Sequence, residues 1–380
     1  MRVLICPDKF KGCLEAPEAA QAIAEGIRSA RPSFQLDLLP LADGGEGTAR
    51  ILREATGGRE VAAEAADPLG RPVRSSFSVL GDGRTAVVEM AAASGLALLR
   101  PDELDPLRTS TRGTGDLIRA ALDRGLRRII VAIGGSATND GGMGMAHALG
   151  ARFLDAGGAE LEPCGEALRR VRGVDLSGMD PRLGECEVTV ACDVANPLLG
   201  EEGATLVYGP QKGAGEEDLR LLEEGMALYA SAVEAAVGRR LSDLSGAGAA
   251  GGLGFGLMAF LGARAEPGIE VVMRAAGFRD RAHRCDLIVT GEGRYDAQTA
   301  YGKTVAGVSR AAGEMGKPLV ILAGALAEEV LSPEDAGDLP ANGERICCLS
   351  IIPHPMRLEE AMATARRNLR YAASQLARLW

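Results

Sequence analysis

Aromatic residues and histidines are scarce in this 380-residue sequence. Phe, Trp and Tyr together make up 3% of it, and there are three histidines. So few aromatic side chains leave little material for stacking the bases of a single-stranded nucleic acid. The formal net charge of −10 also argues against a nucleic-acid or anionic-membrane partner. A small anionic substrate would therefore need a locally positive pocket.

Long apolar runs and patterned cysteines are missing as well. No apolar run approaches the roughly 18 residues of a membrane span, and the opening MRVLICPDKF predicts a buried strand rather than a signal peptide. The eight cysteines show neither metal-ligand spacing nor a disulfide framework. Five of them lie in or beside apolar runs, where a reduced thiol packs as a small hydrophobe: Cys6, Cys192, Cys285, Cys347 and Cys348. We expect a cytoplasmic protein without a membrane partner.

Several catalytic signatures are absent. The sequence contains no G-x-S-x-G, no H-E-x-x-H and no G-x-x-x-x-G-K-[ST], which argues against an α/β-hydrolase, a zinc protease and a standard P-loop. YGKT at 301–304 has the last letters of a P-loop without its spacing. Any nucleotide must therefore be held in another way.

Short apolar runs alternate with longer amphipathic stretches, the pattern of parallel sheets covered by helices. Strands are predicted at 2–7, 35–42, 128–134, 187–193, 285–291, 318–324 and 345–352. Helices are predicted at 16–30, 46–56, 113–124, 143–150, 216–237, 302–315 and 357–378.

Two domains are expected, because the chain is too long for one core. Residues 73–91 read as a β-hairpin around GDGR, which interrupts the alternation of strand and helix. The alternation resumes from Asp286. We therefore predict a discontinuous first domain, 1–60 and 285–380, with an α/β domain, 61–284, inserted into it.

Polar residues gather just after the predicted strands, where ligands bind in open parallel sheets. One such aspartate would be an ordinary helix cap, but five strand ends carry acidic loops. The polar residues that follow these strands are Asp8, Lys9, Lys11, Asp43, Glu46, Asn139, Asp140, Asp193, Asn196, Glu292, Arg294, Asp296 and Gln298. Carboxylates that hold Mg²⁺ or accept a proton, glycine loops and a few basic residues together favour phosphoryl transfer.

The stretch AIGGSATNDGGMGMAHALG, 132–150, concentrates glycines around Ser136, Asn139 and Asp140. Glycine permits positive φ and leaves backbone N–H groups unshielded, which suits a loop around a phosphate. The alternative is a tight β–α turn in which small residues pack a helix onto a sheet. A second glycine-rich stretch, 246–256, precedes an apolar run with helical character.

Nine motifs in order give the sequence a family resemblance. They are PDKFKG (7–12), LADGGEGT (41–48), VVEMAAASGLALL (87–99), TSTRGTGDLI (109–118), IGGSATNDGGMGMAHALGARF (133–153), CDVANPLLGEEGAT (192–205), GPQKGA (209–214), GAGAAGGLGFG (246–256) and DLIVTGEGRYDAQTAYGK (286–303). This set resembles bacterial glycerate kinases of the glycerate 2-kinase type. The resemblance implies a flavodoxin-like domain with a second α/β domain inserted, and phosphorylation of D-glycerate by ATP with Mg²⁺. Lys9 stands where many members of that family have Ser, so Lys11 is the basic residue that better matches the family motif.

Candidate site residues follow from the strand ends and the resemblance together. As catalytic residues we expect Asp193, Lys11, Asp296 and Asp43, with Asp193 a general base or Mg²⁺ ligand and Asp296 a second Mg²⁺ ligand. For the nucleotide we expect Gly134, Gly135, Ser136, Asn139, Asp140, Gly248, Gly251 and Gly252. For the substrate we expect Asp8, Lys9, Glu46 and Arg294.

Two alternatives stay open: a kinase for another small hydroxy acid, and a catalytically silent nucleotide-binding regulator. The regulator would be expected to have lost some of these acidic residues. The position of the phosphorylated hydroxyl and the oligomeric state, a homodimer included, are also open.

Overall fold

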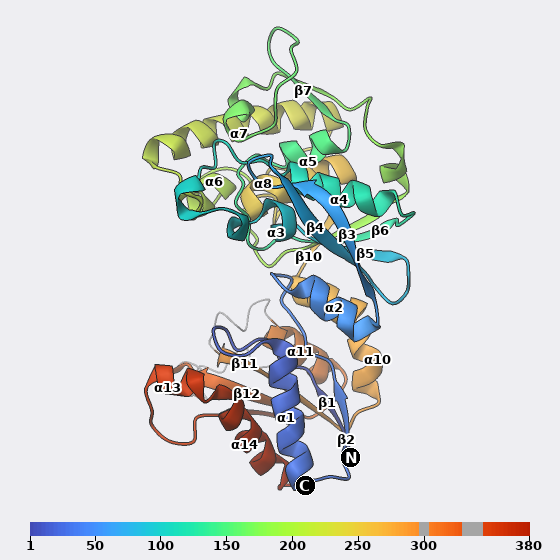
Figure 1. The fold of residues 1–380 in the computed structure, drawn as a ribbon, viewed down its shortest axis with the longest axis vertical. Helices are drawn as coiled ribbons and strands as arrows, with labels where there is room; N and C mark the ends of the chain where they lie inside the picture. The colour runs from blue at the N-terminus through green and yellow to red at the C-terminus, as the bar shows by residue number, and fades with distance from the viewer. Residues whose placement is uncertain (296–303, 329–344) are drawn as a thin grey trace. The chain divides into compact units, whose positions relative to one another are not determined.

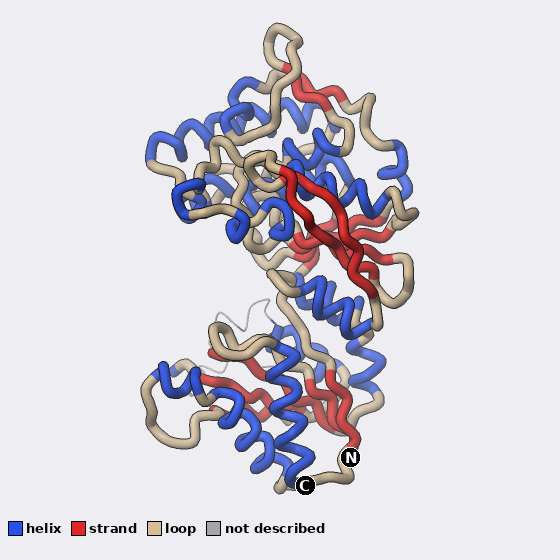
Figure 2. Tube along the Cα trace, viewed as in Figure 1, coloured by secondary structure: helices blue, strands red, loops and turns tan. Residues whose placement is uncertain are grey.

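The computed structural model describes residues 1–295, 304–328 and 345–380. The chain divides into two compact units, Met1–Asp43 with Gly268–Trp380, and Gly44–Pro267. Both contain helices and parallel strands, and the second interrupts the sequence of the first, as the sequence predicted (Figures 1 and 2). This division lies before the predicted boundaries near 60 and 285. Helix α2 (Thr48–Thr56) is fixed within the second unit, where Ala49 N–H donates to Glu89.

The first unit is built on a five-stranded sheet in which every pair is parallel. Its strands, in the order β13-β12-β11-β1-β2, are Ile346–Ser350, Leu319–Leu326, Leu287–Tyr295, Arg2–Ile5 and Gln35–Leu38. This is the flavodoxin-like order, which reverses direction between β1 and β11. Loops at the carboxyl ends of these two strands therefore mark the expected ligand position of the unit.

Helices α1 (Ala16–Ala30) and α14 (Ala365–Ala377) pack together on one face of this sheet. Their apolar residues share a core with alternate positions of the central strands, among them Val3 and Ile5. Gly26 permits the close approach, since a Cβ there would overlap the Arg370 carbonyl oxygen. The remaining helices of the unit are α9 (Gly268–Ala275), α10 (Phe278–His283), α11 (Thr304–Glu314) and α13 (Leu358–Ala363). The single helix predicted at 357–378 is wrong, because the chain leaves helical geometry at Thr364, between α13 and α14.

The second unit is built on a mixed six-stranded sheet. Its strands, in the order β10-β9-β6-β5-β4-β3, are Arg264–Glu266, Glu187–Ala191, Arg128–Ala132, Thr85–Glu89, Pro72–Val79 and Arg59–Ala66. The last three are antiparallel, and the others are parallel. The predicted hairpin is confirmed as β4 and β5, whereas the sequence analysis missed β3.

Two apolar cores fill the second unit. One lies against the sheet and includes residues of α4 (Arg112–Leu122), α5 (Met143–Ala148) and α8 (Ala249–Leu261). The other gathers Phe153, Tyr229 of α7 (Glu216–Val237) and Phe255, whose rings are in contact. The shorter elements are α3 (Ala91–Ser94), α6 (Ala204–Tyr208) and the pair β7 (Arg152–Leu154) and β8 (Gly173–Asp175). No helix within the described ranges is long and apolar enough to cross a bilayer.

All eight cysteines are free thiols. Cys6 and Cys285 are buried, as predicted. Cys347 is exposed, contrary to the sequence interpretation, because β13 is the outermost strand in the order of its sheet.

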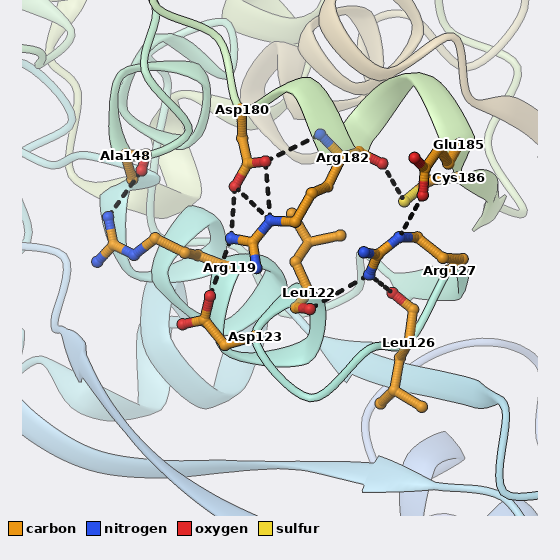
Figure 3. A network of polar contacts seen from close by, with 10 residues as sticks. All are labelled: Arg119, Leu122, Asp123, Leu126, Arg127, Ala148, Asp180, Arg182, Glu185 and Cys186. Atoms are coloured by element: carbon orange, nitrogen blue, oxygen red, sulfur yellow. Dashed lines mark hydrogen bonds and ion pairs between the residues drawn. The ribbon is translucent and has the colours of Figure 1, made fainter.

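A polar network fastens the carboxyl end of α4 to the turn at 180–186 (Figure 3). The Arg182 guanidinium donates to both Asp180 oxygens and to Asp123, which directly follows α4. Arg127 donates to the Leu122 and Leu126 carbonyls and to Glu185. The side chains of this network remain in contact with solvent, so it orients the turn without burying charge.

Candidate functional site

Strands β6 and β9 of the second unit end side by side. In their register Ala132 faces Ala191, and two residues further on the chains reach Gly134 and Asp193. Gly135 and Asp193 are both exposed. The carboxyl edge of this sheet therefore brings together two groups that the sequence predicted at a shared site, the glycine loop after β6 and the aspartate after β9.

Asp140 lies at the buried end of the glycine loop and is 0% exposed. Its Oδ2 accepts hydrogen bonds from Thr111 N, Thr111 Oγ1 and Gly144 N, and its Oδ1 accepts one from Gly142 N. Burial raises the pKa of the carboxyl group, and these donors oppose the rise. Thr111 and Gly142 precede α4 and α5, so Asp140 ties two helix starts together. Its carboxylate stabilises the loop from inside.

Asn139 and Lys212 are also buried beside this loop. The Asn139 amide donates to Thr205 Oγ1, while its Oδ1 has no hydrogen-bond partner among the described residues. Lys212, 1% exposed, donates to the Thr138 carbonyl at 2.6 Å and to Ser136 Oγ at 3.4 Å. Burial lowers the pKa of its ammonium group to about 7, against a smaller opposite effect of Asp140.

The two glycine-rich stretches pack backbone against backbone. A Cβ at Gly251 would overlap the Thr138 carbonyl oxygen, and one at Gly252 would lie 2.8 Å from Gly141 Cα. A Cβ at Gly256 would lie 2.8 Å from Gly142 Cα. What approaches these glycines so closely is thus, in part, another glycine-rich segment of the same unit. The packing alternative accounts for them without a ligand, and the phosphate-binding role of the loop stays a prediction.

A left-handed turn lies at the start of α8. Ala250, Gly251 and Gly252 have φ values of 54°, 66° and 84°. Ala250 is the one non-glycine residue with positive φ among those the structure describes. Such a conformation costs about 1–3 kcal/mol and persists where the surroundings impose it. The Ala250 carbonyl accepts a hydrogen bond from Ser136 Oγ, so the strained turn contributes to the shape of the glycine loop.

The loop before α2 lies over the start of the same glycine loop. A Cβ on Gly134 would be 3.1 Å from Gly45 Cα. Glu89, at the end of β5, accepts from Ala49 N–H in the first turn of α2, and burial raises the pKa of this carboxyl group. The predicted substrate residue Glu46 is exposed in this loop. Gly248, another predicted residue, donates its N–H to the Asn196 carbonyl in the segment that follows Asp193.

In the first unit, the predicted residues Asp8, Lys9 and Lys11 follow β1. Asp8 N–H donates to the Gly291 carbonyl on β11, so this loop lies where the strand order reverses. Asp8 is 9% exposed and accepts from Lys9 N–H and from the Thr304 hydroxyl, at the first residue of α11. Burial, with a smaller contribution from Asp43, raises the pKa of Asp8 to about 6. Perturbed carboxyl groups of this kind are typical of functional sites.

The other predicted residues divide between the two units. Lys11 and Arg294 are exposed in the first unit, which also contains Asp43. Asp296 and Gln298 lie outside the described residues. Within the described ranges no group of three His, Cys, Asp or Glu side chains could hold a metal ion.

Lys212 is the group that the sequence analysis missed. Its motif, GPQKGA, contributed to the family resemblance, but no role was drawn from its lysine. The available signal was a lysine placed between glycines, of which Gly213 has a φ of 101°. Such a placement indicates a constrained turn. Nothing in the sequence shows that this turn contacts Thr138, which is 74 residues earlier in the chain.

Known proteins resemble this chain over nearly its whole length. Residues 3–380 match the glycerate kinase family. A glycerate kinase of Bacillus subtilis (strain 168) is 46% identical over 377 residues, 99% of this chain and 97% of that protein. A glycerate 2-kinase of Escherichia coli (strain K12) is 48% identical over 330 residues, 87% of each. A crystal structure described as glycerate kinase 2 of Salmonella typhimurium LT2 has a TM-score of 0.87 at 44% identity and covers 99% of this chain and 97% of its own.

Proposed function

Since the chain belongs to the glycerate kinase family, we propose that it transfers the γ-phosphoryl group of ATP to D-glycerate and forms 2-phosphoglycerate. Family membership confirms the predicted resemblance and the enzyme class, a phosphotransferase with an alcohol acceptor. The 2-position is proposed because a relative that is 48% identical is named a glycerate 2-kinase. The eight free thiols are consistent with a cytoplasmic enzyme.

The structural observation that supports phosphoryl transfer is the edge at which Gly134 and Asp193 follow neighbouring parallel strands. In the reaction, a glycerate hydroxyl oxygen forms a bond to the γ-phosphorus, and the bond from this phosphorus to the β–γ bridging oxygen breaks. ADP leaves, and the hydroxyl proton passes to a base. Asp193 is our candidate for this base or for a Mg²⁺ ligand.

Mg²⁺ fits the side chains at this edge. The ion typically uses one or two carboxylates together with substrate phosphates, and Asp193 is an exposed carboxylate beside the glycine loop. We propose Asp193 as a ligand; Asp296, the second ligand that the sequence analysis predicts, lies outside the described residues. When bound, Mg²⁺ neutralises charge on the phosphates.

The remaining candidate residues have distinct proposed roles. Gly134, Gly135 and Ser136 form the part of the loop nearest solvent and would meet a phosphate. Asn139, Asp140, Gly248, Gly251 and Gly252 would hold this part in shape. Lys9, Arg294 and the catalytic candidate Lys11 would supply positive charge for a carboxylate or phosphate. Asp8 and Glu46 would bind polar groups of the substrate, and Asp43 stays a catalytic candidate.

One assay tests the function directly. The protein is incubated with D-glycerate and Mg·ATP, and 2- and 3-phosphoglycerate are separated. The expected product is 2-phosphoglycerate. Formation of 3-phosphoglycerate would correct the acceptor position, and preferred turnover of another hydroxy acid would correct the substrate. Nucleotide binding without ADP formation would favour the silent regulator.

The role of Asp193 is tested with Asp193→Asn. A general base contributes about 10²–10⁴-fold, so kcat should fall by that order while the unfolding curve stays unchanged. Glu187→Gln is the matched control, because Glu187 is an exposed carboxylate at the opposite end of β9. Turnover near that of the wild type would remove Asp193 from the reaction.

A further inference from the structure

A lysine is buried beneath the glycine loop of the second unit. Lys212 is in a short turn, Pro210–Lys212, that precedes α7, and its side chain is 1% exposed. Its ammonium group donates to the Thr138 carbonyl and to the Ser136 hydroxyl. Both acceptors are neutral and belong to the loop that follows β6. The lysine is therefore directed at this loop.

No carboxylate among the described residues lies within ion-pair distance of Lys212. Asp140 is the nearby acid, and it favours the charged form of the lysine. Its two oxygens, however, accept from Thr111, Gly142 and Gly144. A buried charge without a direct partner is costly, so the protein's own groups compensate the charged form of Lys212 only in part.

We propose that Lys212 is a positioning residue whose buried ammonium group provides the charge that a phosphate of the nucleotide meets at the glycine loop, and that it acts through Ser136 and Thr138. This inference rests on the proposed function. It identifies the buried group that creates a locally positive binding position for an anion in a chain whose net charge is −10.

Ser136 is the link between this charge and the surface. Its hydroxyl oxygen accepts from Lys212 Nζ and Thr138 N–H, and its proton can be donated to the Ala250 carbonyl. Ser136 is 7% exposed and follows Gly135, which is exposed. An anion at Gly135 would therefore be separated from the ammonium group by one side chain, and interactions between charges are strong where water is excluded.

The second observation is the amide of Asn139. It is 0% exposed, and its Oδ1 has no hydrogen-bond partner among the described residues. Such atoms in folded proteins call for an explanation. Together with Lys212 it means that the inner side of this loop holds a cation and a polar atom whose interactions are incomplete, which is typical of a binding loop rather than of a packing turn.

Protonation of Lys212 should be coupled to anion binding. Burial lowers its pKa to about 7, so the free protein at pH 8 holds mostly the neutral amine. The titratable group that acts on Lys212 is Asp140. Asp140 in turn interacts with Tyr229 from α7 and with Cys164, and burial raises the pKa of all three. An arriving phosphate favours the charged lysine, so binding should take up a proton.

The test uses calorimetric titration of the full-length protein with Mg·AMP-PNP at pH 8, in two buffers of different protonation enthalpy. The wild type should take up roughly one more proton than Lys212→Met. Proton release by the nucleotide is common to both and cancels. The charged fraction of a group with a pKa of about 7 falls roughly 10-fold between pH 6 and pH 8. The affinity of the wild type should therefore fall by up to roughly 10-fold over this range, and the variant should lack this fall.

Lys317→Met is the matched control. Lys317, in the first unit, also donates to two carbonyls, those of His283 and Cys285, but lies outside the proposed site. Its replacement should leave proton uptake as in the wild type. Lys212→Arg retains a charge that does not titrate in this range, so it should restore affinity in part while losing the uptake. A lysine with a purely structural role would change stability and leave the proton count alone.

A measurement on the wild type covers the case in which Lys212 variants do not fold. The chain has five lysines, so ¹³C-lysine labelling gives five Cε signals. One should titrate near neutrality, and its midpoint should rise when Mg·AMP-PNP binds. If no lysine responds to the nucleotide, or the calorimetric proton counts agree between wild type and variant, the inference is wrong although glycerate is still phosphorylated. A wild type that neither binds nucleotide nor phosphorylates glycerate would instead refute the proposed function, and this inference with it.

Discussion

Two groups of charged side chains in the second unit are stabilised in different ways, one by direct ion pairs and the other by hydrogen bonds to neutral groups. In the network of Figure 3, Arg182 pairs directly with Asp180 and Asp123, and all three remain in contact with solvent. At the glycine loop, Asp140 and Lys212 are buried, and each is bonded to neutral groups instead of to the other. Exposed pairs contribute little to stability, because water competes for both partners.

The difference separates a structural from a functional use of charge. Two carboxylates, those of Asp180 and Asp123, pair directly with Arg182 and neutralise its charge. The buried group fixes each charge with the backbone and leaves the positive one incompletely neutralised. A charge kept at such a cost is expected where a ligand completes the arrangement.

The largest expected effect is on Asp140. Asp140→Asn removes a buried charge that four donors stabilise and replaces one carboxylate oxygen by an amide NH₂, so at least one buried donor, such as Gly142 N–H, loses its acceptor. Unfolding by denaturant should show a loss of about 3–5 kcal/mol. Asp155→Asn is the control, a partly exposed aspartate that also accepts from backbone amides, those of Gly157 and Ala159, and it should change the midpoint little. Equal effects would break the contrast between buried and exposed charge.

The next effect concerns Asp8, a buried carboxylate with fewer donors than Asp140. Its pKa rises from 3.8 to about 6 in the folded protein. An acid whose folded pKa is raised stabilises the fold below the unfolded pKa and loses this contribution as pH rises through the folded pKa. Of a total loss of about 3 kcal/mol, about 2 kcal/mol should fall between pH 4 and pH 6, and Asp8→Asn should remove this dependence. Parallel pH profiles for wild type and variant would contradict the assignment.

A smaller effect separates two glycines with the same backbone. Gly251 and Gly238 have φ values of 66° and 67°, but a Cβ at Gly251 would overlap the Thr138 carbonyl, while nothing lies within 4 Å of one at Gly238. Both alanine variants lose stability from the positive φ, about 1–2 kcal/mol. Gly251→Ala should lose about 1–3 kcal/mol more from overpacking, measured by thermal unfolding. Equal losses would mean that the two glycine-rich stretches are loosely packed.

The smallest effect is expected for Arg182→Gln. The two carboxylates that it pairs with, Asp180 and Asp123, keep some contact with solvent, although they raise the pKa of the guanidinium group. The shift in unfolding midpoint should be detectable at low salt and disappear at about 1 M salt, because ions screen exposed pairs. A shift that persists at high salt would mean that the ion pairs of this network are shielded from solvent, as Asp140 and Lys212 are.

The sequence predicted the parallel sheets and the hairpin because their strands are apolar runs bounded by turn residues. It missed β3, whose sequence REVAAEAA has the alanine and charge content of a helix and becomes a strand by pairing with β4. The break at Thr364 was also missed, since the apolar pattern continues through it.

The candidate site was predictable in position but not in its interior. Asp193 and the glycine loop follow predicted strands, so their place at the sheet edge could be deduced. The contact between Gly251 and Thr138 joins segments far apart in sequence. This packing requires glycine at positions where the sequence alone suggested a phosphate-binding loop. The position of Lys212 depends on the same kind of long-range packing, which one sequence does not contain.

The interrupted order of the first sheet affects how the chain is made. Strand β1 pairs with β2 and β11, but β11 begins at Leu287, after the whole inserted unit. A ribosome that adds about 5–20 residues per second needs on the order of 10–50 s to cover that distance. Until then β1 and β2 form at most a two-stranded pair, which is marginal in water. While the inserted unit is being made, β1 therefore lacks its neighbour β11, and of the elements that cover Val3 and Ile5 in the finished core only α1 has been synthesised.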